Sequence, residues 1–391
     1  MKINNILRPT FWKVVSVIIV TAGLYSTYFR FTRGLGAATN LFDAAPWGLW
    51  IGFDFLGVGL AAAGFTIAAT VHIFHMHKFE PVVKPAILTA FIGYSLVATL
   101  LVVDLGRPEN FWHPLVMWNI HSVMFEITWC LICYTTVLIL EFAPVVLEKF
   151  KLNSPIKLLK KISIPVVIAG VLFSTLHQSS FGSLYLIVPG RLYPLWYSPL
   201  LPVHFYISCI GAGLSMVIFE SYLIARAFNK GLKMNILSGA AFAVLIDLIT
   251  SFLLKAFDFI FAGKLYLLMV PAKETYLFYL EILIGTFIPV FLLSQKRVRE
   301  DRKWLYISTI FVISGFILNR FNISITGLER SAGYAYFPSF DELSITLMLV
   351  VIAMFAFRLV VKIFPVFEEN HYPEQAKQKN IFGINKLTLG E

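Results

Sequence analysis

The chain has 391 residues, of which 58% are hydrophobic and only 14% are charged. Soluble proteins carry about 25% charged residues, so this composition excludes an ordinary soluble domain. The formal net charge of +10 could suggest a nucleic-acid partner. Membrane proteins, however, gather Lys and Arg in their cytoplasmic loops. We therefore interpret the charge as a signal of membrane orientation and expect a lipid bilayer, and no nucleic acid, as the surroundings.

Ten apolar stretches follow one another along the chain, and each can cross a hydrocarbon core of about 30 Å. They cover residues 13–29, 48–74, 85–103, 121–143, 162–187, 203–228, 236–262, 276–294, 304–325 and 342–364. The first exceeds the apolar region of a signal peptide and no A-x-A site follows it, so we expect it to be retained. The sequence predicts an all-α polytopic membrane domain over residues 1–366 and a cytoplasmic tail over 367–391.

The basic residues indicate the orientation of these spans. Under strict alternation, the side of the N-terminus holds 23 Lys and Arg residues and the opposite side holds 8. Short loops rich in Lys and Arg face the cytoplasm, so both termini are predicted to lie inside. The inner loops, such as KFKLNSPIKLLKK, contain little besides this topogenic charge.

The outer connections differ from the inner ones because they mix aromatic residues, Pro, Gly and charge. They read DLGRPENFWHP at 104–114, HQSSFGSLYLIVPGRLYPLWYSP at 177–199 and SAGYAYFPSFDE at 331–342. An aromatic belt at the membrane surface explains residues such as Trp112, Tyr334 and Tyr336. It does not explain the neighbouring His, Arg and Asp, which suggests that chemistry takes place on this side.

Several ionisable residues lie inside the apolar stretches, where each costs about 2.5–3.5 kcal/mol to insert and therefore indicates function. They are Asp54, Glu126, Glu220, Asp247, Lys255, Asp258 and Glu281. Asp54 accompanies a run of Gly and Ala that permits close helix contact, so we expect it to face the bundle interior. Lys255 and Asp258 are three residues apart on one helix and are expected to neutralise each other.

The histidines argue against haem, which in a membrane bundle needs two axial His on facing helices. No pair lies near mid-membrane, because His113, His121, His177 and His204 all sit toward the outer ends of their stretches. An imidazole near neutral pH can exchange protons with a carbonyl, so the outer histidines suit a quinone headgroup. His177 opens the polar run HQSSFGS inside an apolar span, which predicts a pocket there. No metal site is predicted.

At these motifs the chain resembles the NrfD/polysulfide-reductase-type membrane subunits, and within them the membrane subunit of hydrogenase-2-type nickel–iron hydrogenases. The motifs are APWGLWIGFD at 45–54, VVDLGRPENFW at 102–112, NIHSVMFE at 119–126, LEFAP at 140–144, TLHQSSFGSL at 175–184, YPLWYSPLLP at 193–202 and GYAYFPSFDEL at 333–343. They occur in order over nearly the whole chain. DLGRP is widespread in the family, whereas HQSS with GYAYFP is more specific.

The resemblance implies four-helix bundles of the NrfD type and a site for menaquinone or ubiquinone near the outer face. It also implies a periplasmic four-cluster iron–sulfur partner, nickel–iron hydrogenase large and small subunits, and location in the bacterial inner membrane. Asp54 and His177 match the family's site residues. Glu126 is a candidate proton relay, and His121, Gln178, Asp104, Arg107, Tyr334 and Tyr336 are candidate quinone contacts.

Other interpretations remain open at this stage. Asp104 and Arg107 either bond each other over the pocket or form a structural turn, and Tyr334 and Tyr336 either cover the quinone or anchor a helix. Glu220, Asp247 and Asp258 are candidates for a proton path. The alternatives for the whole protein are a subunit of another quinone or quinol oxidoreductase (polysulfide, nitrite or quinol:cytochrome type), a secondary transporter, and a purely structural anchor.

Overall fold

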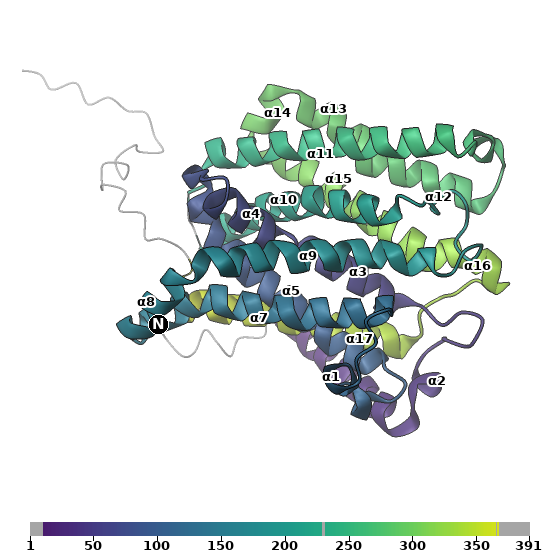
Figure 1. Ribbon diagram of the computed structural model, residues 1–391, viewed down its shortest axis with the longest axis horizontal. Helices are drawn as coiled ribbons and strands as arrows, with labels where there is room; N and C mark the ends of the chain where they lie inside the picture. The colour runs from purple at the N-terminus through teal and green to yellow at the C-terminus, as the bar shows by residue number, and fades with distance from the viewer. Residues whose placement is uncertain (1–10, 229–230, 365, 367–391) are drawn as a thin grey trace, which may run out of the picture.

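The computed structural model describes residues 11–228, 231–364 and 366, so the predicted tail at 367–391 lies outside the described residues. The described residues form helices joined by short connections (Figure 1). The long elements are α1 (Phe11–Arg33), α3 (Leu49–Ala61), α4 (Ala63–His72), α5 (Val83–Asp104), α7 (Val123–Lys149), α9 (Ser163–Leu186), α10 (Leu201–Phe228), α11 (Met234–Phe261), α12 (Lys273–Ile282), α15 (Arg302–Phe321) and α17 (Phe340–Ile363). The short ones are α2 (Leu35–Ala38), η2 (His77–Val82), η3 (Pro108–Asn110), α6 (His113–Val116), α8 (Asn153–Lys161), η4 (Leu265–Met269), η5 (Leu283–Phe287), α13 (Ile288–Ser294), α14 (Lys296–Glu300), η6 (Asn322–Thr326) and α16 (Gly327–Ala332).

Ten helical segments of the described chain are long and apolar enough to span a membrane, which confirms the ten predicted stretches. They are Phe11–Arg33, Leu49–His72, His77–Asp104, Val123–Lys149, Ser163–Leu186, Leu201–Ala227, Met234–Phe261, Lys273–Ser294, Arg302–Ala332 and Phe340–Ile363. Several are formed by consecutive elements, such as α3 with α4. The all-α polytopic fold is therefore as predicted.

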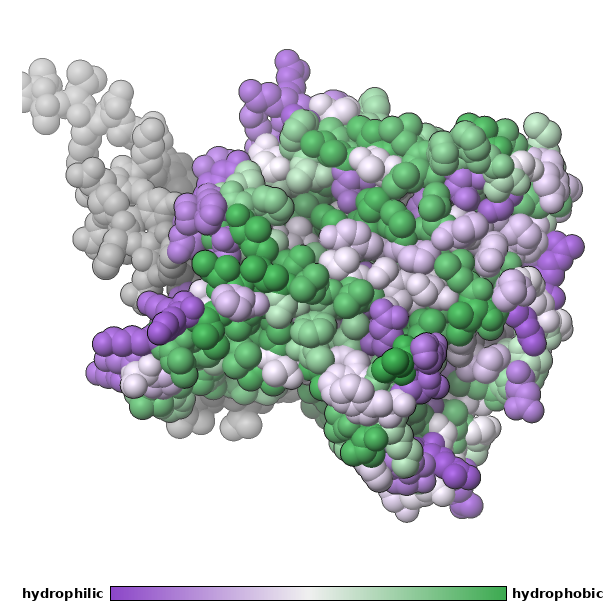
Figure 2. All heavy atoms as spheres, in the orientation of Figure 1, coloured by the Kyte–Doolittle hydropathy of each residue, from purple (hydrophilic) through white to green (hydrophobic). Residues whose placement is uncertain are grey.

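The two ends of this helical body differ in character. One end, which we name the basic end, carries α8, α14 and the turn after α4, and lies on the left of Figure 1. The other, the loop-rich end, carries α2, α16 and the connection 187–200, and lies on the right. Figure 2 shows hydrophobic residues over much of the surface between the two ends and hydrophilic residues gathered toward both. This is the distribution of a body surrounded by lipid.

The spans form two four-helix bundles, which confirms the predicted architecture. In the first, α5 contacts α3, α4 and α7, and α9 contacts α4 and α7. In the second, α10 contacts α11 and α15, and α13 contacts α11 and α15. The bundles meet where α10 packs against α3, α4 and α9, and where α15 packs against α3. Helices α1 and α17 pair beside the first bundle, where α17 contacts α5.

The small residues of the second span hold this arrangement together. A Cβ on Gly57 would meet Val97, and one on Gly64 would meet Ala90, so these glycines face α5. A Cβ on Gly52 would instead meet Ser324, on the second bundle. Glycine lets helix backbones approach closely, as expected for packing in a membrane. The span is consequently wedged between the two bundles with Asp54 inside.

Two arginines that the orientation count assigned to the outer side of the membrane are buried within spans. Arg30 and Arg320 are each only 1% exposed. Arg30 donates from Nε to the carbonyl of Val103 at 2.9 Å and from a terminal nitrogen to that of Leu105 at 2.5 Å. These carbonyls end α5, where a cation satisfies free acceptors and the negative end of the helix dipole. Arg30 thus fastens α1 to α5.

The close approach of α10 to the joint of α3 and α4 gives a test of the seam between the bundles. A Cβ on Gly213 would lie 2.5 Å from the backbone nitrogen of Ala63, whereas one on Gly239 in α11 would meet nothing nearer than 3.6 Å. We expect Gly213→Ala to destabilise the fold by about 1–3 kcal/mol, because backbone cannot yield as a side chain does. The matched Gly239→Ala should be neutral or slightly stabilising. Thermal unfolding in detergent measures the stability of both variants. Equal unfolding midpoints for the two variants would contradict close backbone packing at the seam between the bundles.

Candidate functional site

The interior of the first bundle holds the two residues that the sequence ranked first. Asp54 on α3 is 3% exposed and His177 on α9 is completely buried. Both neighbour Tyr94 of α5: its ring lies 5.6 Å from that of His177, and its hydroxyl is within electrostatic range of Asp54. The structure thus brings Asp54 and His177 together around one tyrosine.

A series of aromatic contacts leads from the loop-rich end into this interior. The ring of Trp47 lies 5.6 Å from that of Tyr185, which lies 6.0 Å from that of Phe55. Phe55 lies 4.6 Å from Phe181, whose ring is 4.7 Å from His177. These rings come from α9 and from the start of the second span, and edge contacts of this kind fix ring orientation. Side chains at the surface are therefore linked to His177 by rigid packing.

The polar groups of this interior are unusual because many of them form no hydrogen bond. They are Asp54 Oδ1, both nitrogens of His177, both amide atoms of Gln178 and the hydroxyl of Tyr185. Native proteins leave few buried polar atoms unsatisfied, and such atoms indicate contact with water or a ligand. The first bundle thus has a polar lining suited to passing protons.

A pocket opens at the loop-rich end, beside the outermost ring of that series. Its volume is about 180 Å³, and Trp47, Arg191, Tyr334 and Tyr336 line it. A cavity of about 150 Å³ accommodates benzene, so this pocket is large enough for a quinone ring. Arg191 and the indole of Trp47 supply hydrogen-bond donors for a carbonyl oxygen. The pocket and the Asp54–His177 cluster are connected through Trp47.

Tyr336 contributes to this pocket mainly by holding its wall. Its hydroxyl donates to Glu342 and accepts from the backbone N–H of Leu49 at 2.9 Å. Glu342 also accepts from the backbone N–H of Asn40 at 3.2 Å. Burial and the bond to Glu342 raise the pKa of the Tyr336 phenol, so it remains a donor. Tyr336 thus ties the start of α3 to the start of α17, whereas Tyr334 is exposed.

Asp104 and Arg107 do not form the pair that the sequence allowed. Arg107 is exposed, and the described residues contain no ion pair or hydrogen bond between the two. Asp104 instead lies within electrostatic range of Arg30, Glu342 and Asp54. It extends the polar cluster of Asp54 toward α1 and α17.

The other two predicted residues of the outer side lie apart from this cluster. His121 is exposed in the connection before α7, and Glu126 is half-buried in the first turn of that helix. Neither lines any of the three described pockets. The structure therefore does not bring them to Asp54 and His177.

The second bundle contains a network centred on Glu281, which is 3% exposed. Its carboxylate accepts from Lys255 at 2.9 Å, Trp196 at 2.8 Å, Asn319 at 2.8 Å and Asn322 at 2.9 Å. All four donors lie far from Glu281 along the chain. A carboxylate with four donors is fully satisfied, as a buried ion pair requires.

The predicted pairing of Lys255 with Asp258 is therefore wrong. Asp258 pairs instead with Lys264 at 3.3 Å and accepts from the hydroxyl of Ser198 at 2.8 Å. Spacing by three residues puts two side chains on one face of a helix, but here each reaches a partner on another element. These bonds attach the end of α11 to the connection 187–200.

The remaining predicted acids lie deeper in the body. Glu220 on α10 accepts from the hydroxyl of Thr89 at 2.7 Å and lines a pocket of about 100 Å³ that also includes Lys233 at the basic end. Asp247 on α11 lies against Gly211 and lines a cavity of the second bundle. The two acids therefore border two separate pockets.

Comparison with known proteins identifies the family. A family model described as polysulphide reductase, NrfD, matches residues 37–332. The chain belongs to the NrfD family. Among its relatives, the probable Ni/Fe-hydrogenase 2 b-type cytochrome subunit of Escherichia coli is 32% identical, with 86% of this chain and 87% of the relative covered. The menaquinone reductase integral membrane subunit of Nitratidesulfovibrio vulgaris is 25% identical, with 92% of each covered. A selenate reductase subunit of Mesobacillus selenatarsenatis is 26% identical, with 95% of this chain and 98% of the relative covered.

Several residues of this NrfD protein escaped the sequence analysis. Trp47 and Arg191 were visible only as parts of the motifs APWG and PGRLYP, without an assigned role. Arg320 was counted with the basic residues of the outer side, because it lies near the end of the predicted stretch 304–325. A charge that interrupts an apolar run was the available signal for Arg320.

The revised pairing of Lys255 predicts energetic coupling with Glu281 but not with Asp258. In double-mutant cycles, Lys255→Met and Glu281→Gln should show a coupling free energy of about 0.5–3 kcal/mol, because the two groups share one bond. Lys255→Met and Asp258→Asn should be additive within about 0.5 kcal/mol. Unfolding in detergent measures the free energies. A coupling free energy between Lys255 and Asp258 instead would support the ion pair within α11.

Proposed function

We propose that this NrfD protein is the quinone-binding membrane anchor subunit of a respiratory oxidoreductase. It exchanges electrons between a periplasmic iron–sulfur subunit and menaquinone or ubiquinone in the membrane, in a complex with nickel–iron hydrogenase. The observation that carries the proposal is the pocket of about 180 Å³, whose wall residue Trp47 begins the series of rings that reaches His177. The hydrogenase-linked E. coli relative supports the choice of partner.

The residues of the site divide into those that bind the ring and those that handle protons. A bound quinone takes up two electrons and two protons, so both kinds are needed. Arg191 and Tyr334 donate hydrogen bonds to the quinone oxygens at the pocket. Asp54 and His177 exchange protons along the buried polar lining, where both imidazole nitrogens and Asp54 Oδ1 form no hydrogen bond. Gln178, next to His177, and Asp104 extend this lining.

The deeper acids are proposed to carry protons from the basic end. Glu220 collects them at the pocket bordered by Lys233. Ser215, whose buried hydroxyl forms no hydrogen bond, lies on α10 between Glu220 and Gly211, which faces Asp247. Asp258 stays a weaker candidate, because Lys264 and Ser198 already satisfy it. Glu126 and His121 would exchange protons with the loop-rich side.

The orientation and partners follow from charge and exposure. We propose that the basic end faces the cytoplasm of a bacterial inner membrane and that the loop-rich end faces the periplasm. The connection before α7 exposes a group of large apolar side chains there: Phe111, Leu115, Val116, Met117, Trp118 and Ile120. A four-cluster iron–sulfur subunit, itself joined to the hydrogenase large and small subunits, would dock at this end.

A second candidate is membership of a different quinone or quinol oxidoreductase. The similarity to subunits of a menaquinone reductase and a selenate reductase favours it. The same pocket would serve, and electron flow would depend on the partner. No feature of the described structure favours the transporter interpretation over these two.

The proposal includes no haem, although one relative is named a b-type cytochrome subunit. In the described chain, the ring contact between two histidines is that of His75 with His77, exposed at the basic end and only two residues apart. Axial ligands must face each other from different helices. We expect the purified chain to lack haem absorbance in reduced-minus-oxidised spectra. A stoichiometric b-type signal would refute this part of the proposal.

The two groups of site residues should differ in their kinetic effects. In the purified complex, Asp54→Asn or His177→Phe should lower kcat for hydrogen-dependent quinone reduction by at least about 100-fold, the usual size of acid–base effects. Arg191→Gln should raise KM about tenfold with a smaller change in kcat, because it removes a binding contact. Initial rates at varied quinone concentration separate the two parameters.

Controls make the result specific to the quinone site. Hydrogen oxidation with a soluble dye should remain at the wild-type rate in all three variants, because the catalytic metal centre is in another subunit. Arg33→Gln, an exposed arginine at the end of α1, should leave kcat and KM unchanged. Wild-type kinetics for Asp54→Asn in an intact complex would rule out its proposed role.

A further inference from the structure

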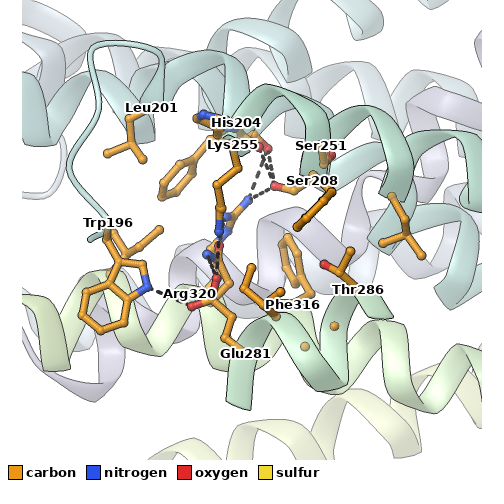
Figure 3. A pocket seen from close by; sticks show the side chains of 18 of the residues that line it. Trp196, Leu201, His204, Ser208, Ser251, Lys255, Glu281, Thr286, Phe316 and Arg320 are labelled. Atoms are coloured by element: carbon orange, nitrogen blue, oxygen red, sulfur yellow. Dashed lines mark hydrogen bonds and ion pairs between the residues drawn. The ribbon is translucent and has the colours of Figure 1, made fainter. Parts of the chain in front are cut away.

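The second bundle contains a cavity of about 110 Å³ that the proposed quinone site does not use. Figure 3 shows its walls: His204, Ser208, Ser251 and Lys255 come from α10 and α11 on one side, and Glu281, Thr286, Phe316 and Arg320 come from α12, η5 and α15 on the other. Two π-helical segments, η5 and η6, adjoin it. Such segments are rare and frequently occur at functional sites.

The charges around the cavity do not balance pair by pair. Lys255 is bound to Glu281, and Asp258 is bound to Lys264, so each of these pairs is neutral. Arg320 and Asp247 remain, and neither forms an ion pair with any described residue. Both line the cavity. A buried charge without a bound counter-charge is costly, so an additional anion beside Arg320 would stabilise it whenever Asp247 is neutral.

The direct contacts of Arg320 are neutral groups, although the carboxylate of Glu281, which is bound to Lys255, lies within electrostatic range of it. Its guanidinium lies 3.9 Å from the ring centre of Phe205 and 4.3 Å from that of Phe316. Its terminal nitrogens donate to Asn319 at 2.7 Å, to Ser208 at 2.8 Å and to the carbonyl of Phe205 at 3.2 Å. The Nε atom has no acceptor. The cation is held rigidly with one donor still free.

Other features of the cavity also favour a small anion. The hydroxyl of Ser251 is buried and forms no hydrogen bond, which adds a second free donor. The volume of about 110 Å³ is smaller than the roughly 150 Å³ of a cavity that binds benzene, so the space favours a small ligand. It exceeds the roughly 30 Å³ share of a water molecule several-fold. A halide-sized ion with two or three waters matches this space.

We propose that this cavity binds one small monovalent anion of the halide class beside Arg320, with the free Nε donor of Arg320 and the hydroxyl of Ser251 available to it. Asp247, on the same cavity, opposes the anion whenever its carboxylate is ionised. Binding therefore neutralises Arg320 and depends on the charge state of Asp247. The proposal is independent of the proposed quinone site, which is a separate pocket at the loop-rich end and has its own assay.

Chloride-35 NMR of the purified full-length complex tests the proposal. Chloride replaces gluconate stepwise at constant ionic strength. The chloride line width in excess of that of free chloride reports bound chloride. We expect saturable broadening that Arg320→Gln abolishes. Arg302→Gln should retain it, because this arginine begins the same helix, is exposed and lies over Tyr222 away from the cavity. Broadening that is absent, or equal in the wild type and Arg320→Gln, would overturn the proposal.

Two further variants keep the test decisive if Arg320→Gln fails to assemble. Asp247→Asn should tighten chloride binding at least about fivefold, because it removes the opposing charge. Ser251→Ala should weaken binding by a similar factor through loss of a donor. Unchanged affinity in both would contradict the site. Displacement of chloride by a menaquinone analogue would also overturn it and assign the cavity to a second quinone.

Discussion

The close packing of the glycine-rich second span is the constraint on which the rest of the structure depends. Its glycines face α5 on one side and the second bundle on the other, so α3 and α4 touch both bundles. The same span begins at Trp47 in the pocket and carries Asp54 in the interior. Without side chains to separate the backbones, helices can approach closely even though lipid gives no hydrophobic drive. Pocket and interior are consequently placed by one rigid element.

The two bundles solve the problem of buried polarity in opposite ways. The second satisfies its carboxylate Glu281 with four donors from four other segments of the chain, which stabilises a fixed geometry. The first leaves Asp54, His177 and Gln178 without hydrogen bonds. Unsatisfied groups cost free energy, and proteins retain them where function needs them. The contrast favours proton chemistry in the first bundle and a structural or ion-binding role in the second.

Hydropathy was sufficient to predict all ten spans, because membrane insertion depends on local composition and length. The burial of Asp54 and His177 was also predictable, since each interrupts an apolar run beside small or polar neighbours. Pairings were not. Lys255 finds Glu281, 26 residues away, rather than Asp258 on its own helix. Arg320 was counted with the outer basic residues because it lies near the end of the predicted stretch 304–325, but its span extends through η6 and α16. Such contacts depend on how distant helices pack, which spacing along one helix does not reveal.

The packing of His177 is compatible with its proposed role in proton exchange. Its ring is held by Tyr94 at 5.6 Å and Phe181 at 4.7 Å, so aromatic contacts orient it. A histidine oriented by hydrogen bonds has one nitrogen committed to its partner, which fixes the tautomer. Here both nitrogens remain free. Orientation by rings therefore lets the same side chain accept a proton on one nitrogen and release one from the other.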